Sequence, residues 1–214
     1  MEPEQKQKVD LRCAIVCGAP IENKAWLSNE IREHDFIIAA DSGYDHLVSI
    51  GVSPNVIIGD MDSICNTPDN IKCYKYPVKK DLTDFSICLE YCLNNNIENI
   101  DVYGAWGNRA DHSLAAIFAM LQYSKKGLRI RIINESALFI IVSNTIKIPK
   151  NNGYVSVFSL DGTAYGVTLK NFEYPLQDFD LNCCSPLGVS NRIIGDYGEI
   201  TVNKGFLLIV IQNQ

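Results

Sequence analysis

The sequence predicts an α/β fold, with an N-terminal parallel-sheet α/β domain followed by a C-terminal all-β sandwich domain. In the first half, short continuous apolar runs end in Gly or Asp, and a stretch with helical spacing follows each run. Strands that are buried on both faces have this appearance, and they occur in parallel sheets covered by helices on both sides. In the second half, apolar runs follow one another across turn residues without a convincing helical pattern, which is typical of an antiparallel sandwich.

Strands and helices alternate in the first half. The third predicted helix is the clearest, because its apolar residues form a stripe with a spacing close to 3.6 residues. The predicted strands cover residues 13–17, 36–40, 56–58 and 100–103. The predicted helices cover about 24–33, 44–50, 82–95 and 113–125.

The pattern changes near residue 128, and we predict an α/β catalytic domain over 1–127 and a β-sandwich domain over 128–214. Asn-Gly, Asp-Gly and Lys-Gly turns separate several of the later strands. The first of these strands could instead be the last strand of the N-terminal sheet. The predicted strands of this half cover residues 128–133, 138–142, 154–159, 164–169, 199–202 and 206–211.

Composition excludes several classes of protein. The 214 residues are 47% hydrophobic, which is enough for a sizeable core, and no apolar run approaches the length of a membrane-spanning helix. A net charge of −6 without a basic stripe argues against a nucleic-acid binder. The eight cysteines include no C-x-x-C pair, and the polar start of the chain is no signal peptide. We therefore expect reduced thiols in a cytoplasmic protein.

Acidic residues follow two of the predicted strands. Asp41 comes directly after one strand, and Asp60 and Asp62 come after the next. Ligands of an open α/β sheet bind outside the carboxyl ends of its strands, so these carboxylates are expected at one edge. An Asp-x-Asp pair with phosphate oxygens suits Mg²⁺. The alternative is a strand-ending turn, which Asp also favours.

A second acidic cluster opens the third helix. Asp81 suits the N-cap position, and Asp84 at the third helical position resembles a capping box. The same helix N-terminus could instead hold phosphate, with the help of Lys80 and the Thr83 hydroxyl. Taken in isolation, Asp81 and Asp84 favour the capping interpretation over a functional one.

A third cluster opens the fourth helix. Arg109 can bind phosphate oxygens in a bidentate manner. Asp111 can serve as a cap, a ribose contact or an orienting acceptor. His112 could be an acid–base group, although a lone His at the start of a helix is more often structural. In the second half, the segment 187–191 is interpreted as a polar loop between strands.

Taken together and in order, these motifs resemble the thiamine pyrophosphokinase family, also called thiamine diphosphokinase. The resemblance extends over about residues 13–211. Arg192 departs from the family, which commonly has an acidic residue there. The matching motifs are Ala40-Asp41-Ser42-Gly43, Gly59-Asp60-Met61-Asp62-Ser63, Lys80-Asp81-Leu82-Thr83-Asp84, Gly107-Asn108-Arg109-Ala110-Asp111-His112 and Gly188-Val189-Ser190-Asn191.

The resemblance implies an enzyme that transfers the diphosphate of ATP to the thiamine hydroxyl, giving thiamine diphosphate and AMP. It also implies Mg²⁺ as cofactor and a homodimer with active sites between subunits. By matching position, Asp60, Asp62 and Asp84 are metal ligands and, with Asp41, catalytic residues. The remaining matches are Lys80, Thr83, Arg109 and Asp111 on the ATP side, and Ser190 and Asn191 on the thiamine side.

Two other functions are consistent with part of this pattern. A metal-dependent glycosyltransferase also uses an Asp-x-Asp after a strand to hold a nucleotide diphosphate, but it would not need the Thr83-Asp84 and Ser190-Asn191 clusters. A non-catalytic thiamine or nucleotide sensor on the same fold is the other alternative. Crowded carboxylates are costly to keep without a cation, which argues against the sensor.

Overall fold

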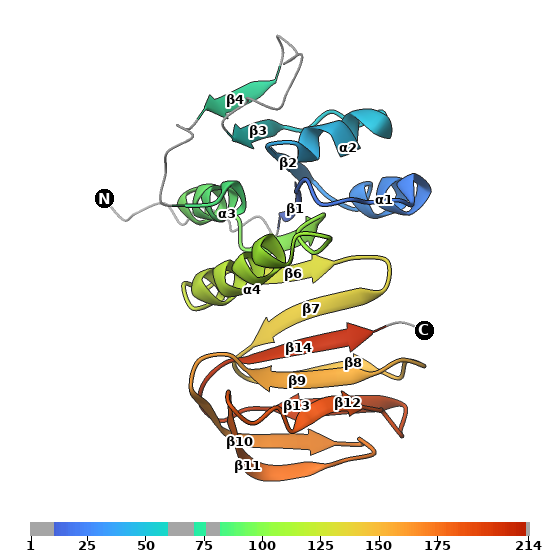
Figure 1. Ribbon diagram of the computed structural model, residues 1–214, viewed down its shortest axis with the longest axis vertical. Helices are drawn as coiled ribbons and strands as arrows, with labels where there is room; N and C mark the ends of the chain where they lie inside the picture. The colour runs from blue at the N-terminus through green and yellow to red at the C-terminus, as the bar shows by residue number, and fades with distance from the viewer. Residues whose placement is uncertain (1–10, 60–70, 76–81, 213–214) are drawn as a thin grey trace, which may run out of the picture.

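The computed structural model describes residues 11–59, 71–75 and 82–212 (Figure 1). The helices are α1 (Lys24–Ile31), α2 (Gly43–Ser49), α3 (Asp84–Asn94) and α4 (Ala110–Ser124). The strands up to the fourth helix and just beyond it are β1 (Arg12–Val16), β2 (Phe36–Ala40), β3 (Val56–Gly59), β4 (Lys72–Lys75), β5 (Asn99–Tyr103) and β6 (Arg129–Ile133). The later strands are β7 (Ala137–Val142), β8 (Thr145–Pro149), β9 (Val155–Ser159), β10 (Thr163–Lys170), β11 (Leu176–Asn182), β12 (Gly188–Asn191), β13 (Tyr197–Thr201) and β14 (Leu207–Gln212).

A ten-stranded sheet runs through both halves of the molecule in the order β12-β9-β14-β7-β6-β5-β1-β2-β3-β4. The strands from β6 to β4 pair in parallel, and those from β12 to β6 pair antiparallel. In Figure 1 the parallel strands and their helices form the upper part, and the antiparallel strands form the lower part. The predicted α/β region followed by an all-β sandwich is therefore confirmed.

Helices cover both faces of the parallel strands, which explains the continuous apolar runs. On one face, α3 and α4 pack on β1, β2 and β5 through side chains such as Leu89 and Met120, both fully buried. On the other face, Leu27 of α1 and Leu47 of α2 are fully buried against the alternate residues of the same strands. Among the described helices, none is long and apolar enough to cross a membrane.

A second sheet, in the order β11-β10-β13-β8, packs on the antiparallel half of the first sheet. Val157 and Ile209 of the large sheet meet Val167 and Ile200 of the small sheet, and all of them are fully buried. Alternation of buried and exposed residues along these strands follows from packing on one face only. This packing forms the predicted sandwich.

The structure corrects several details. The segment 187–191 is no loop, because Gly188–Asn191 form the edge strand β12, which pairs with β9. The strands β4, β8 and β11 were also missed. The strand β6 pairs in parallel with β5, as the alternative for residues 128–133 allowed, and antiparallel with β7. The division at residues 127 and 128 stays a prediction.

Candidate active site

The loops that follow β1 and β2 and the last residue of β3 pack against one another at the carboxyl edge of the parallel strands. A Cβ atom on Gly43 would lie 1.9 Å from the carbonyl oxygen of Val16, so only glycine allows this approach. Gly59, the last described residue before the gap at 60–70, would meet the Cα of Asp41 at 3.0 Å in the same way. The sequence therefore folds these loops into one continuous rim.

Asp41 stands at this rim with an unusual backbone. Its φ of +46° lies in the left-handed region, which costs free energy for a residue other than glycine. Its N–H donates to the carbonyl of Ile58 at 2.9 Å, and its carbonyl accepts from Tyr44 at 3.1 Å. These bonds hold the residue where β2 turns into α2, and strained positions of this kind concentrate at functional sites.

Asp84 belongs to the same rim. It is the first residue of α3, and its negative charge acts on Cys17 at the end of β1. Burial, reinforced by the charge of Asp84, raises the pKa of Cys17 to about 12. Because β1 and β2 are neighbouring parallel strands, Asp84 and Asp41 lie at adjacent strand ends.

The N-cap of α3 is Thr83, and this corrects the predicted capping by Asp81. The Thr83 hydroxyl accepts from the Ser86 N–H at 3.2 Å and lies 2.9 Å from the Ser86 hydroxyl. Asp84 therefore occupies the first helical position and not the third. The cause is the hydroxyl of Thr83, which satisfies an N–H that the helix leaves unpaired. Asp84 is therefore not the cap of α3.

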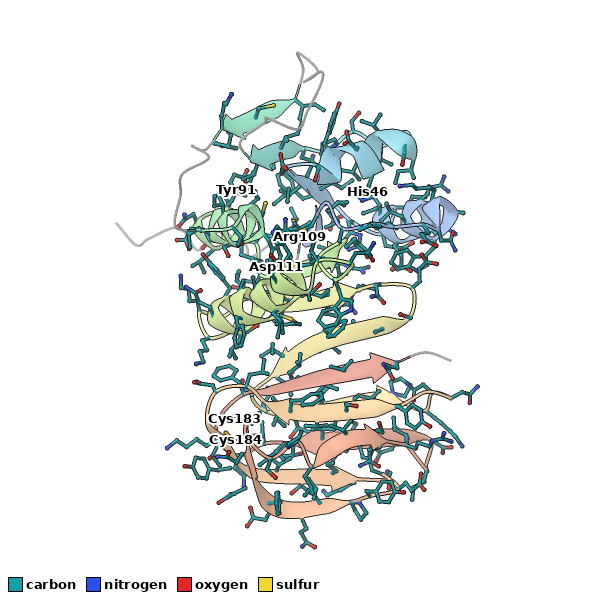
Figure 2. The ribbon with its side chains drawn as sticks, viewed as in Figure 1. His46, Tyr91, Arg109, Asp111, Cys183 and Cys184 are labelled. Carbon is teal, nitrogen blue, oxygen red and sulfur yellow. The ribbon has the colours of Figure 1, made fainter. Side chains whose placement is uncertain are left out.

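The loop after β5 supplies the third cluster. The buried Ser113 hydroxyl accepts from the Gly107 N–H at 3.1 Å and lies 3.1 Å from the Arg109 carbonyl. Arg109 donates through Nε and Nη2 to the two carboxylate oxygens of Asp111, at 3.2 and 2.6 Å (Figure 2). Both side chains are exposed, and the hydrogen bond from Arg109 lowers the pKa of Asp111. Asp111 thus orients the guanidinium at the start of α4.

His46 is a further residue of this region, which the sequence analysis missed. Its Nε2 donates to the carbonyl of Ala19 at 2.9 Å, and its Nδ1 accepts from Lys24 Nζ at 2.9 Å (Figure 2). Burial, followed by the charge of Lys24, lowers its pKa. Ala19 itself donates to the carbonyl of Gly104 at 2.9 Å. No pattern in the sequence signals this role, because the partner is a backbone carbonyl.

The acidic donors at the rim suit a hard divalent cation, because carboxylate oxygens are the ligands that Mg²⁺ prefers. Asp41 and Asp84 are placed there by the structure. Asp60, Asp62, Lys80 and Asp81 lie outside the described residues. Within the described ranges no group of three or more potential metal ligands occurs.

The two predicted thiamine residues lie on β12. Ser190 has a φ of +59°, and its N–H donates to the Ser156 hydroxyl at 3.0 Å. The pairing of β12 with β9 shifts register between Gly188 and Asn191, and such irregularities redirect side chains. The Asn191 side chain is buried and bridges to Tyr174, accepting from its N–H at 3.0 Å and donating to its carbonyl at 2.7 Å. Arg192 donates to the Tyr154 hydroxyl at 2.7 Å.

Within a single chain, β12 lies far from the rim. Six inter-strand steps separate β12 from β1 in the sheet. At about 4.8 Å for each step, the separation along the sheet is about 30 Å. The predicted site residues therefore form two groups, with Asp41, Asp84, Arg109 and Asp111 in the first half of the chain and Ser190 and Asn191 in the second.

Comparison with known proteins matches both halves. Residues 27–132 match the family model described as the catalytic domain of thiamin pyrophosphokinase, and residues 143–207 match the model of its vitamin B1 binding domain. A thiamine pyrophosphokinase of Bacillus subtilis is 29% identical over 205 residues, which cover 92% of this chain and 96% of the relative. A crystal structure of thiamine pyrophosphokinase from the same organism has a TM-score of 0.84 at 27% identity, covering 95% of this chain and 99% of the other. The structure from Geobacillus thermodenitrificans, at 22% identity, shares the fold with a TM-score of 0.80 over 95% of this chain and 98% of its own.

Proposed function

The chain belongs to the thiamine pyrophosphokinase family, and we propose which of its residues carry out the transfer of pyrophosphate from ATP to thiamine. Both domain models of the family match, in order, and the matched relatives cover nearly the whole chain. These relatives give no support to a glycosyltransferase or to a sensor. The enzyme is a thiamine pyrophosphokinase of the thiamine diphosphate pathway.

The packing of the strand-end loops supports a phosphate-binding centre at the rim. We assign Asp60, Asp62 and Asp84 as ligands of Mg²⁺, with Asp41 as a neighbouring acid. A bound Mg²⁺ would neutralise charge on the phosphate oxygens during the transfer. The Asp84 carboxylate acts on Cys17 at the rim, where a cation would offset its charge.

Arg109, Asp111, Lys80 and Thr83 are assigned to the ATP side. Asp111 engages only part of the N–H donors of the Arg109 guanidinium, so the others can bind phosphate oxygens. Thr83 caps α3 and places its hydroxyl beside the first N–H groups of that helix. Such a terminus favours an anion, and positioning supplies most of the catalysis in phosphoryl transfer.

Ser190 and Asn191 are assigned to thiamine. The left-handed backbone of Ser190 and the irregular pairing of β12 present the serine side chain at an exposed edge. Asn191 contributes by bridging β12 to Tyr174, which keeps the edge strand in place. In this assignment Ser190 contacts thiamine directly. Asn191 shapes the surface that thiamine contacts.

The separation of about 30 Å along the sheet supports a homodimer in which two chains complete each site. The transfer requires the thiamine hydroxyl to reach the ATP phosphates directly. A second copy would bring its β12 edge to the rim of the first. The exposed apolar residues Leu187 and Val189 beside Ser190 fit a surface that another chain covers.

Incubation with ATP, Mg²⁺ and thiamine tests the activity, with AMP and thiamine diphosphate as the expected products. Asp84→Asn and Asp62→Ala are expected to lower kcat by about 100-fold or more while the chain stays folded. Asp45→Asn is the matched control for Asp84, since Asp45 is also an acidic residue in the first turn of a helix. Release of ADP in place of AMP would overturn the reaction, and a fully active Asp84→Asn would overturn the metal assignment.

Mixing two inactive variants tests the shared site. Asp84→Asn damages the rim, and Ser190→Tyr obstructs the β12 edge. If each site uses both chains, random exchange restores about a quarter of the wild-type activity, because half of the dimers are mixed and each carries one intact site. No recovery after subunit exchange would place the whole site within one chain.

A cytoplasmic location is also proposed. The seven cysteines in the described ranges are all free thiols, and Cys73, Cys183 and Cys184 among them are exposed. Exposed thiols persist in a reducing compartment. Fractionation of cells followed by immunoblotting is the direct test.

A further inference from the structure

A cavity of about 620 Å³ lies at the amino ends of β1, β5 and β6, at the edge of the sheet opposite to the candidate active site. Arg12 pairs with Asn99 across the first two strands, and Asn99 pairs with Arg129 across the next two. The far wall comes from the end of β7 and the start of β8. Nothing in the proposed reaction uses this cavity.

Positive charge is concentrated here, although the chain as a whole carries a net charge of −6. Three of the six arginines in the sequence, Arg12, Arg129 and Arg131, line the cavity. Their side chains are 45%, 64% and 44% exposed, so each guanidinium is accessible. The nearby acidic partners are Asp101 and Glu98.

Three basic side chains contact the Asp101 carboxylate, which carries a single negative charge. Arg131 donates to both of its carboxylate oxygens at 2.6 Å, and Arg12 approaches at 3.4 Å. His34 adds a third contact, with Nε2 at 2.9 Å from the same carboxylate. The cavity lining therefore holds three guanidinium groups and the single carboxylate of Asp101, with Glu98 beside Arg129 just outside the lining.

His34 holds Asp101 from the side of α1. Its Nδ1 lies 3.0 Å from the carbonyl oxygen of Glu30, and its Nε2 lies 2.9 Å from the Asp101 carboxylate. The imidazole therefore connects α1 to Asp101 on β5. With Asp101 held by His34 and Arg131, the side chains of Arg12 and Arg129 remain 45% and 64% exposed at the cavity.

The rest of the lining combines apolar and polar side chains. Ile140, Ile146 and Phe206 supply an apolar wall, and Asn99 and Asn144 supply polar groups. A ligand with an organic part and an anionic group would find a matching surface for each.

We propose that this cavity is a binding site for an organic phosphate, in which the exposed guanidinium groups of Arg12 and Arg129 bind the phosphate and the apolar wall contacts its organic part. Guanidinium groups match phosphate oxygens in bidentate geometry. A volume of about 620 Å³ falls within the range of small-molecule pockets, and a sugar phosphate fits it. The site is separate from the rim, so it does not depend on the proposed roles of the catalytic residues.

Isothermal titration calorimetry with ribose 5-phosphate as the probe tests the proposal. The test variant is Arg12→Gln/Arg129→Gln, which leaves the Arg131–Asp101 contact intact. The matched control is Lys147→Gln/Lys170→Gln, which removes the same charge from two lysines paired with Glu199 on the small sheet. Wild type and control are expected to bind equally, and the arginine variant at least about tenfold more weakly.

Inorganic phosphate is the second probe. It shows how much of the affinity comes from the anion alone and how much from the organic part of the ligand. Weaker binding of inorganic phosphate than of ribose 5-phosphate supports a contact with the apolar wall, and equal binding overturns it. The proposal fails if wild type does not bind ribose 5-phosphate at millimolar concentration, or if the arginine variant binds it as well as wild type does. Circular dichroism verifies that both variants are folded. The pyrophosphokinase assay is run in parallel, and its outcome has no bearing on the binding result.

Discussion

Asp101 is a buried carboxylate whose charge stabilises the junction of β1, β5 and β6. Burial alone would raise its pKa, but hydrogen bonds from His34 and Arg131 outweigh burial and hold the pKa well below its usual range. A folded-state pKa below the unfolded value means that the ionised form stabilises the fold. This stabilisation is complete above about pH 4, the unfolded value, and is lost as the pH falls further.

Asp101→Asn is therefore expected to lower the free energy of unfolding by about 2 to 4 kcal/mol at pH 7, because Arg131 loses its counter-charge and His34 loses an ionised hydrogen-bond acceptor. The difference from wild type should stay constant down to about pH 4 and shrink as the pH falls further. Urea denaturation at several pH values measures both effects. Asp161→Asn is the control, since Asp161 is 58% exposed in its ion pair with Lys125 and should cost less than about 1 kcal/mol. A pH-independent difference would contradict the assigned role of the charge.

His46 allows a second prediction at the scale of single residues. Because its Nε2 holds the Ala19 carbonyl beside the rim, His46→Ala should lower kcat by about tenfold through misplaced loops. His46→Gln retains a side-chain N–H donor and should recover most of the rate. Steady-state kinetics with kcat and KM separated gives the measurement. Equal losses in the Ala and Gln variants would show that the hydrogen bond to Ala19 is unimportant, and Ser49→Ala on the exposed side of α2 is the control.

At the scale of secondary structure, the left-handed backbone of Ser190 in the edge strand β12 is expected to lower the stability of the fold while it favours substrate binding. Ser190→Gly removes the cost of a left-handed backbone and should raise the free energy of unfolding by about 0.5 kcal/mol, after the entropy of glycine is counted. The same change removes the proposed thiamine contact, so the KM for thiamine should rise. Asn96→Gly, at a φ of +57° after α3, should give a similar stability change with an unaltered KM. If both variants leave the KM unchanged, Ser190 is not a substrate contact.

The sequence predicted the elements that are buried on both faces and missed those that are not. β2, for example, is a continuous apolar run between two helical layers, and its predicted bounds agree with the structure. By contrast, β4 and β12 are edge strands, and β8 and β11 are the edges of the small sheet. An edge strand pairs on one side only and keeps polar residues exposed, so its sequence resembles a loop. Its partners are distant in the chain and have no local signal.

The candidate site was also predictable only in part. Asp41 could be placed because parallel strands share a carboxyl edge, which is a property of the fold class. The capping of α3 could not be assigned correctly, because Thr83 and Asp81 are both good N-cap residues and the sequence does not choose between them. His46 and the cluster around Asp101 depend on contacts between distant strands and helices. Patterns along one strand or helix contain no information about them.

At the scale of the whole molecule, the continuous ten-stranded sheet predicts that the two halves fold together. A cut between residues 127 and 128 would separate β5 from β6 and remove Arg131 from the buried Asp101. It would also expose the edge of β5 and the apolar face of α4 that packs near β6 and β7. We therefore expect the fragment 1–127 to be unfolded or aggregated, even though it carries the proposed ATP-side residues.

The full chain should then unfold in a single cooperative transition. Val157→Ala in the sandwich core and Ile57→Ala in the parallel core should each lower the midpoint of that one transition, and the isoleucine change should lower the free energy of unfolding by about 2 to 5 kcal/mol. Far-ultraviolet circular dichroism and the fluorescence of Trp26 and Trp106 provide two probes, and their unfolding curves should coincide. Two resolved transitions, with each variant shifting only the one for its own half, would show that the sheet does not couple the halves. Coexpression of 1–127 with 128–214 extends the test: if the sheet is the folding unit, the two fragments should regain structure only when they are together.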